Sequence, residues 1–229
     1  MQKQVIILFG PPGAGKGTQS ELLSEKFSLY YFETSRILEE TFKNKAGVSF
    51  KIGGTEYSVA GEKKLWEEGK LCNPPFVAHL VQEKIKELFK KGESLILAGS
   101  PRTIYEAEKV MPLVENLYSK ENIKVAVIEI SPEQTIFRNS NRKICELMRH
   151  PILFNKETEN LTVCPLDGSK LERRKGLDDP ESIKVRLKEY KERTYPVIEY
   201  FEKTGIKVAK VKGEQSVADV YKDILKAIG

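Results

Sequence analysis

Residues 10–18 combine glycines and a lysine at a spacing that suits the binding of phosphate groups. The segment has the form G-x-x-x-x-G-K and consists of Gly10, Pro11, Pro12, Gly13, Ala14, Gly15, Lys16, Gly17 and Thr18. Glycines let backbone N–H groups wrap a phosphate closely, a lysine ammonium bridges the outer phosphates, and a threonine hydroxyl can lie near a magnesium ion. We therefore expect ATP or a similar triphosphate to bind here with Mg²⁺.

Arginines form a second set of candidate site residues. The chain has nine arginines, and seven of them lie between Arg138 and Arg193. A guanidinium group binds phosphate oxygens through paired hydrogen bonds and keeps its charge. Phosphoryl transfer depends on positioning and on neutralising charge, and an acceptor phosphate is already a nucleophile, so no carboxylate or histidine base is required. The clustering thus favours phosphoryl transfer.

Apolar runs that resemble strands alternate with amphipathic stretches that resemble helices. The runs at residues 5–9, 95–99, 125–130 and 206–211 are followed by helix-like stretches at 16–26, 103–118, 132–143 and 216–228. This alternation predicts an α/β fold in which a parallel sheet carries helices on both faces. A longer helix is expected over residues 180–203, bent or interrupted at Pro196.

Two stretches break this rhythm. Residues 43–58 are polar and contain several glycines, which is typical of a loop or hairpin. Residues 151–179 contain Pro165, Gly168 and Gly176 among short alternating pieces. We expect both stretches to belong to mobile lobes, because a site for phosphoryl transfer must close to exclude water.

Composition limits the class of protein. A chain of 229 residues with 40% hydrophobic and 31% charged residues can bury one core with small lobes attached. Its apolar runs are far shorter than the roughly 20 residues that span a bilayer, and no signal-peptide pattern is present. Three cysteines are too few for a disulfide framework. We expect a cytoplasmic protein without a membrane partner, and the absence of an aromatic and basic platform argues against a nucleic-acid partner.

The ending Gly-Lys-Gly-Thr-Gln of the phosphate loop resembles the signature of the adenylate kinase family, and similar motifs follow in order along nearly the whole chain. Gly99-Ser-Pro-Arg-Thr103 resembles the family motif Asp-Gly-Phe-Pro-Arg-Thr, and further matches are Gly69-Lys-Leu before Cys72, Arg138, Arg142, Arg174, Asp178, Asp179 and Arg186. The resemblance implies a monomeric nucleoside monophosphate kinase that uses Mg-ATP and AMP. Its expected fold is a P-loop, doubly wound parallel sheet of five strands with two inserted mobile lobes.

The resemblance also implies roles for individual residues. Arg102 and Arg186 would hold the acceptor phosphate, Arg142 and Arg174 would contact the transferring group, and Arg138 would lie over the donor adenine. Asp178 and Asp179 would orient arginines. The implied catalytic residues are Lys16, Arg102, Arg142, Arg174 and Arg186, and the implied acceptor-binding residues are Thr34, Arg36, Cys72, Gly99, Arg102, Glu106, Arg174 and Arg186. Residues 33–72 would close over the monophosphate and residues 143–174 over ATP, around a core of residues 1–32, 73–142 and 175–229.

In some members of this family the lid over ATP holds zinc through two Cys-x-x-Cys or Cys-x-x-Asp pairs. This chain has Cys145-Glu-Leu-Met148 and Cys164-Pro-Leu-Asp167, and methionine is a poor zinc ligand. His150 could complete a tetrahedral set with Cys145, Cys164 and Asp167. A metal-free lid held by packing and hydrogen bonds stays open as the alternative.

Several positions depart from the family pattern and leave the acceptor open. Ala98 replaces an aspartate that anchors magnesium-bound waters, and Glu129 is a candidate substitute. Glu39 replaces an arginine that grips the AMP phosphate, a role that Arg36 could take over. Glu106 replaces the glutamine that reads adenine, and a carboxylate suits the two adjacent donors of guanine. GMP is therefore an alternative acceptor, and a catalytically weak nucleotide-binding protein is a further alternative.

Overall fold

The computed structural model describes residues 3–149, 151–173 and 178–229. Its centre is a parallel sheet of five strands in the order β10-β6-β1-β5-β2. The strands are β1 (Val5–Phe9), β2 (Tyr30–Glu33), β5 (Leu95–Ala98), β6 (Ile123–Glu129) and β10 (Val208–Lys212). This arrangement confirms the predicted α/β class and the doubly wound parallel sheet.

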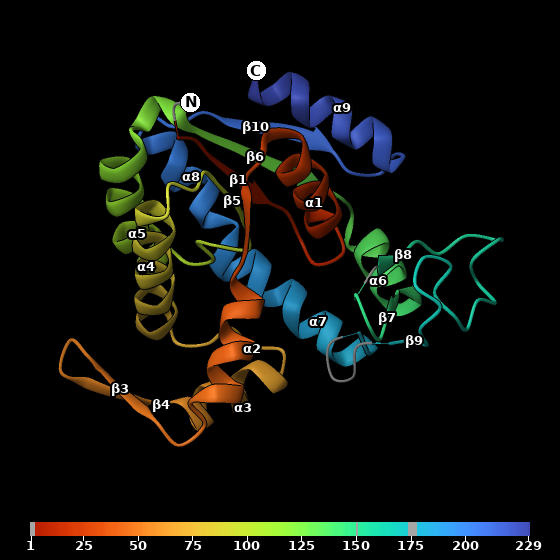
Figure 1. The fold of residues 1–229 in the computed structure, drawn as a ribbon, viewed down its shortest axis with the longest axis horizontal. Coiled ribbons are helices and arrows are strands. Elements are labelled where there is room, and N and C mark those ends of the chain that lie inside the picture. The colour runs from red at the N-terminus through yellow and green to blue at the C-terminus, as the bar shows by residue number, and fades with distance from the viewer. Residues whose placement is uncertain (1–2, 150, 174–177) are drawn as a thin grey trace.

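Helices cover both faces of the sheet (Figure 1). Val5, Ile7 and Phe9 of β1 pack with residues of α4 (Pro74–Lys90), α5 (Ile104–Tyr118) and α8 (Pro196–Lys203). Ile6 and Leu8 pack on the opposite face with α1 (Lys16–Phe27) and α9 (Val217–Ile228). Because β1 is buried on both faces, its sequence is an unbroken apolar run, as parallel strands require.

Strand β2 was not among the four runs that the sequence pattern identified. It is a four-residue edge strand in which only Phe32 is buried, so it carries no clear periodic signal. Its place in the sheet comes from pairing with β5, in which Glu33 lies opposite Ala98. The carboxyl end of β2 therefore reaches the same edge of the sheet as the phosphate loop.

The first insert lies between β2 and α4 and consists of α2 (Thr34–Asn44), the hairpin of β3 (Ser49–Ile52) and β4 (Thr55–Ser58), and α3 (Val59–Glu67). Gly53 and Gly54 form the hairpin turn, with φ values of 58° and 86° that suit glycine. The hairpin expected within residues 43–58 is thus confirmed. Phe50 packs against Phe76 of α4 with ring centroids 5.5 Å apart, which ties the protruding hairpin to the core (Figure 1).

The second insert follows α6 (Pro132–Asn141) and contains a small antiparallel sheet in the order β8-β7-β9. Its strands are β7 (Lys143–Cys145), β8 (Pro151–Ile152) and β9 (Leu171–Glu172). Cys145, Cys164 and Leu171 form a separate apolar cluster there. This part of the chain therefore has its own small core beside the main sheet (Figure 1).

The helix expected over residues 180–203 is divided. It begins as α7 (Pro180–Glu189), widens into a π turn at Tyr190–Thr194, and continues as α8. The Tyr195 N–H donates to the Tyr190 carbonyl, 2.8 Å away, and Pro196 has no N–H to continue the α-helical ladder. The proline therefore interrupts the helix as predicted. A short 3₁₀ turn, Lys120–Asn122, completes the described elements, and none of the described helices is long and apolar enough to cross a membrane.

Candidate functional site

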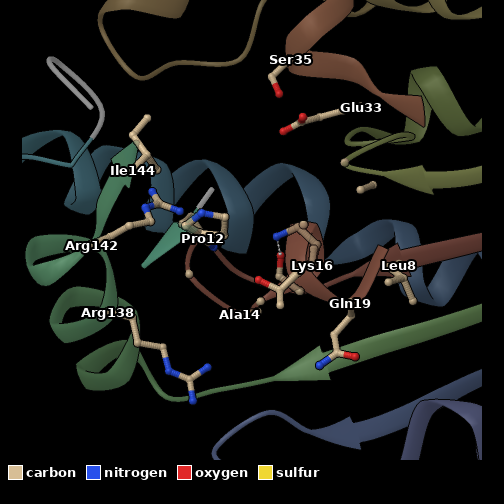
Figure 2. Close-up of a pocket in the computed structure, with 18 of the residues that line it drawn as sticks. Leu8, Pro12, Ala14, Lys16, Gln19, Glu33, Ser35, Arg138, Arg142 and Ile144 are labelled. Carbon is tan, nitrogen blue, oxygen red and sulfur yellow. Dashed lines mark hydrogen bonds between the residues drawn. The ribbon is translucent and has the colours of Figure 1, made fainter. Parts of the chain in front are cut away.

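A cavity of about 1150 Å³ opens at the carboxyl ends of the parallel strands. We call it the main cavity; its walls come from the phosphate loop, α2, α6, α7 and the loop after β5. Figure 2 shows Arg138 and Arg142 on one side of the phosphate loop and Glu33 and Ser35 on the other. Ligands of open α/β sheets bind at this edge. Pockets for one small ligand measure roughly 300–1000 Å³, so the main cavity is large enough to admit two.

Glycines set the backbone conformation of the phosphate loop, and Lys16 donates hydrogen bonds to its carbonyl groups. Gly13 has a φ of 81°, and a Cβ atom there would lie 2.6 Å from Asn139 Nδ2. A larger residue at this position is therefore excluded both by backbone conformation and by space. Lys16 Nζ donates to the Gly10 carbonyl at 2.6 Å and to the Pro11 carbonyl at 2.9 Å. These contacts hold the ammonium group against the loop at the N-terminus of α1.

Oxygen ligands suited to magnesium lie beside this loop. Thr18 in the first turn of α1 and Glu33 at the end of β2 both line the main cavity. Hydroxyl and carboxylate oxygens are the ligands that Mg²⁺ prefers, so the residues present fit a magnesium ion that accompanies a triphosphate. Glu129, the substitute suggested by the sequence, is exposed and does not line this cavity in the described part of the chain.

Asp178 organises two of the expected arginines. Its carboxylate is buried and accepts hydrogen bonds from Nε of Arg142, at 3.2 Å, and from Nη2. Arg186 Nη1 lies 3.8 Å from the same carboxylate. A buried carboxylate needs such cationic partners, and in return it fixes the direction of both guanidinium groups.

The remaining members of this group are placed differently. Arg138 lines the main cavity and donates to the Gly213 carbonyl at 2.8 Å. The Asp179 carboxylate accepts from the Ser182 N–H at 2.9 Å and caps α7, and its expected role in orienting an arginine stays a prediction. That hydrogen bond lowers the pKa of Asp179. Arg174 lies outside the described residues.

A smaller pocket of about 20 Å³, with room for about one water molecule, adjoins the main cavity and contains several of the expected acceptor-binding residues. It is lined by Thr34, Leu38, Trp66, Lys70, Leu71, Cys72, Val77, Arg102 and Glu106, and it shares four of these residues with the main cavity. Thr34 is buried, and its hydroxyl has no hydrogen-bond partner within the described part of the chain. An unpaired buried hydroxyl is costly, so this pocket offers a polar group to a ligand.

We call the smaller pocket the acceptor pocket, after the residues expected there. Arg102 and Glu106 are its charged residues in addition to Lys70. Arg102 Nε donates to the Gly99 carbonyl at 2.7 Å, and a Cβ atom at Gly99 would lie 2.5 Å from Arg102 Nη2. Glycine at position 99 is therefore what admits the guanidinium group. Glu106 is buried and accepts from the Arg102 N–H at 2.9 Å and from the Thr103 hydroxyl at 3.2 Å. Burial raises the pKa of Glu106, although these hydrogen bonds oppose the effect.

Cys72 lines the same pocket, and its thiol is not reactive. Its Sγ donates to the Glu62 carbonyl at 3.4 Å, and burial raises the pKa of the thiol to about 12. The side chain thus stays neutral and is a poor nucleophile at physiological pH. Cys72 lines the smaller pocket, and the expected backbone contact with an acceptor base stays a prediction.

Two ion pairs in the wall of the main cavity include Arg36 and Glu39, two positions that depart from the family pattern. Arg36 Nε lies 3.0 Å from Glu33 Oε2, and both side chains line the main cavity. Glu39 lies 3.9 Å from Arg149, which follows β7 in the second insert. The reversed charge at Glu39 therefore has a basic partner from the opposite wall of the cavity.

Sequence reasoning assigned no role in the site to Glu33, Trp66 or Glu189. All three line the main cavity, and Glu189 accepts from the Leu71 N–H at 3.4 Å and from Arg193 at 2.9 Å. Glu33 had a detectable signal, because it directly follows the apolar run at residues 29–32 and precedes an expected site residue, Thr34. Trp66 and Glu189 lie on the helices α3 and α7. The helical repeat of a sequence does not distinguish a residue that faces a cavity from one that faces the core, so neither residue gave a signal.

The second insert gathers three of the four expected metal ligands. Ligand atoms of Cys145, Cys164 and Asp167 all lie within 4.8 Å of one another. Cys145 Sγ donates to Asp167 Oδ2 at 3.1 Å, and hydrogen bonds from Ser169 and Cys145 lower the pKa of Asp167. Thiol and carboxylate ligands suit zinc. His150, the fourth expected ligand, lies outside the described residues, and Met148 is exposed.

Comparison with known proteins gives a consistent picture. The model of the adenylate kinase family matches residues 8–206. An adenylate kinase of Caldicellulosiruptor bescii is 36% identical over 228 residues, which cover 98% of each chain. An adenylate kinase of Petrotoga mobilis is 33% identical over 97% of this chain and 96% of its own length. One of Methanothrix thermoacetophila is 31% identical over 97% of both chains.

Proposed function

The chain belongs to the adenylate kinase family of nucleoside monophosphate kinases, and we propose that it transfers the γ-phosphoryl group of Mg-ATP to AMP, giving two molecules of ADP. The observation that carries this proposal is the shared wall of the two pockets. The phosphate loop lines the main cavity, and Arg102 lines both pockets. The Thr34 hydroxyl, which has no partner among the described residues, lies in the acceptor pocket. A donor and an acceptor phosphate can thus meet beside one guanidinium group.

In the proposed mechanism the residues position phosphates and neutralise charge. Lys16 and the backbone N–H groups of the loop hold the outer phosphates of ATP, while Thr18 contributes an oxygen toward Mg²⁺. When bound, Mg²⁺ supplies neutralisation of charge on the phosphate oxygens. Arg102 and Arg186 hold the acceptor phosphate, and Arg142 faces the transferring group with its direction fixed by Asp178. Arg174 is assigned to the same step by resemblance alone.

Recognition of the donor and acceptor bases completes the proposal. Arg138 lies at the far side of the phosphate loop from the acceptor pocket and is assigned to the donor adenine. The backbone at Cys72 and the side chain of Glu106 line the acceptor pocket and are assigned to the acceptor base. Arg36, at the rim of the main cavity, is assigned to the acceptor phosphate.

Water is excluded in this proposal by closure of the two inserts. Residues 33–72 close over the monophosphate and residues 143–174 close over ATP, around the core of residues 1–32, 73–142 and 175–229. The separate apolar cluster of the second insert supports movement of that insert as a unit (Figure 1). Closure would bring together phosphate-binding residues that come from different elements.

The experiment that tests the function measures products formed from Mg-ATP with AMP, GMP, CMP or UMP, separated by chromatography. The Lys16→Ala variant serves as the blank for contaminating kinases. We expect rapid formation of ADP with AMP. A preference for GMP would instead make Glu106 a reader of guanine, and the absence of turnover with every acceptor would favour a protein that only binds nucleotides.

The second insert is proposed to hold one structural zinc ion through Cys145, Cys164 and Asp167, with His150 as the fourth ligand by resemblance. The close approach of the three ligand atoms supports this proposal. Metal analysis of protein purified without a metal-affinity tag should give about one zinc per chain. A value near zero in a protein whose second insert resists proteolysis would establish the metal-free alternative.

Two further proposals concern the state of the protein in the cell. All three cysteines are free thiols, which supports a reducing compartment such as the cytoplasm. The resemblance favours a monomer, and light scattering during size-exclusion chromatography measures this directly. A mass near twice 26.0 kDa would contradict it.

A further inference from the structure

Magnesium in a P-loop kinase needs a carboxylate near the phosphate loop in addition to the threonine hydroxyl. Such an acid commonly lies at the carboxyl end of a strand close to the strand that carries the loop. Here the strands on either side of β1 are β5 and β6. Strand β5 ends in Ala98, which has no ligand atom, and β6 ends in the exposed Glu129, which does not line the main cavity in the described part of the chain.

Glu33 is placed where this missing acid is needed. It is the last residue of β2 and lies opposite Ala98, and Ala98 in turn lies opposite Leu8 of β1. The three residues therefore form a row across the carboxyl edge of the sheet. Figure 2 shows the Glu33 carboxylate pointing into the space beside the phosphate loop that Lys16 also faces. The other described acids that line the cavity, Glu21, Glu39, Glu40 and Glu189, lie on helices.

The contacts of Glu33 leave it able to bind the hydration shell of a cation. Oε2 accepts from Arg36 Nε at 3.0 Å, and Oε1 has no hydrogen bond within the described part of the chain. The side chain is 31% exposed, so water can reach it. Mg²⁺ keeps several of its waters when it binds to proteins, and a partly exposed carboxylate can accept hydrogen bonds from them.

We propose that Glu33 is the carboxylate that accepts hydrogen bonds from the waters of the magnesium ion bound to ATP. Strand β2 thus supplies the acid that β5 lacks, because Glu33 lies directly opposite Ala98 in the sheet. The pairing with Arg36 keeps the carboxylate at the edge of the cavity. This inference rests on the proposed function, because it concerns the magnesium ion of that reaction.

The test measures binding of a non-hydrolysable ATP analogue by isothermal titration calorimetry at a series of Mg²⁺ concentrations. We expect Glu33→Gln to raise the Mg²⁺ concentration for half-maximal tightening of nucleotide binding by about tenfold. Affinity without Mg²⁺ should not fall. The matched control is Glu40→Gln, which removes an exposed acid of the same cavity and should leave the Mg²⁺ dependence as in the wild type.

A second variant separates this role from a role in holding Arg36. If Glu33 acted only by neutralising Arg36, the double variant Glu33→Gln/Arg36→Gln would recover the wild-type Mg²⁺ dependence, and that result would overturn the proposal. An unchanged Mg²⁺ dependence in Glu33→Gln would overturn it as well. Because the readout is binding, it stays informative if the AMP assay shows no turnover, which would count against the proposed function alone.

Discussion

The two sides of the main cavity bind phosphate by different means. On the ATP side the loop of residues 10–18 relies on backbone N–H groups and one lysine, all within a single short segment. On the acceptor side the pocket is assembled from side chains of α2, α3, α4 and α5 and of the loops before α4 and α5. The departures from the family pattern at Glu39, Ala98 and Glu106 all lie on this side or beside the magnesium position.

The difference shows where substitutions can be compensated. A backbone N–H cannot be supplied by another residue, so the loop must keep its glycines and its spacing. A side chain in a pocket built from several elements can be replaced by one from a neighbouring strand or from the opposite wall. Glu33, which lies opposite Ala98 in the sheet, is the proposed example.

The largest expected effect concerns the ATP side. Lys16→Ala should lower kcat by about 100-fold or more, because it removes a fixed positive charge from the transferring phosphates. The fold should remain intact, which circular dichroism can check. Lys26→Ala, in the last turn of the same helix, is the matched control and should have a normal rate. A near-normal rate in Lys16→Ala would contradict the assignment of the loop.

Arg102→Ala tests the acceptor side in the same way. We expect kcat/KM for AMP to fall by about 100-fold, while the affinity for an ATP analogue changes little. Steady-state kinetics and calorimetry measure the two quantities separately. Arg173→Ala removes an exposed arginine and serves as the control. Equal losses of AMP and ATP binding would mean that the two sides are not independent.

Glu106 should make the stability of the acceptor side depend on pH. Burial raises its pKa in the folded protein above the ordinary value of about 4.5. Its contribution to stability is therefore fully present below pH 4.5 and is lost as the pH rises through the folded-state pKa. Glu106→Gln does not titrate, so the stability of the wild type relative to this variant should fall as the pH rises.

Chemical denaturation of both proteins between pH 4 and pH 8 measures this difference. Glu108→Gln, an exposed acid on the same helix, is the control and should show no such trend. A difference between wild type and Glu106→Gln that stays constant with pH would show that the Glu106 carboxylate is not destabilised by burial.

The smallest effect is expected at the ion pair between the two inserts. Glu39 and Arg149 are 37% and 55% exposed and 3.9 Å apart, so their coupling should be below about 1 kcal/mol. A double-mutant cycle with Glu39→Gln and Arg149→Gln, measured on KM for AMP, gives this value. A much larger coupling would mean that the pair is shielded from water when the inserts close.

Features that depend on residues close together in the sequence were predictable. The phosphate loop is a local motif, the buried strands are unbroken apolar runs, and Pro196 interrupts its helix because it lacks an N–H. The edge strand β2 was missed, since four residues with a single buried side chain give no period. Asp179 illustrates the same limit, because adjacent aspartates look alike in sequence although one is buried among arginines and the other caps a helix.

The sequence by itself determined the parallel α/β fold and the phosphate loop, because backbone chemistry and hydrophobic alternation are local properties, and the order of its motifs gave the resemblance that implies the kinase class. Only the tertiary structure decided which charges meet. The pairing of Asp178 with Arg142, the burial of Glu106 and the register that places Glu33 opposite Ala98 join residues distant in sequence. Such contacts depend on how helices and strands pack, and packing is set by the whole core rather than by any one segment.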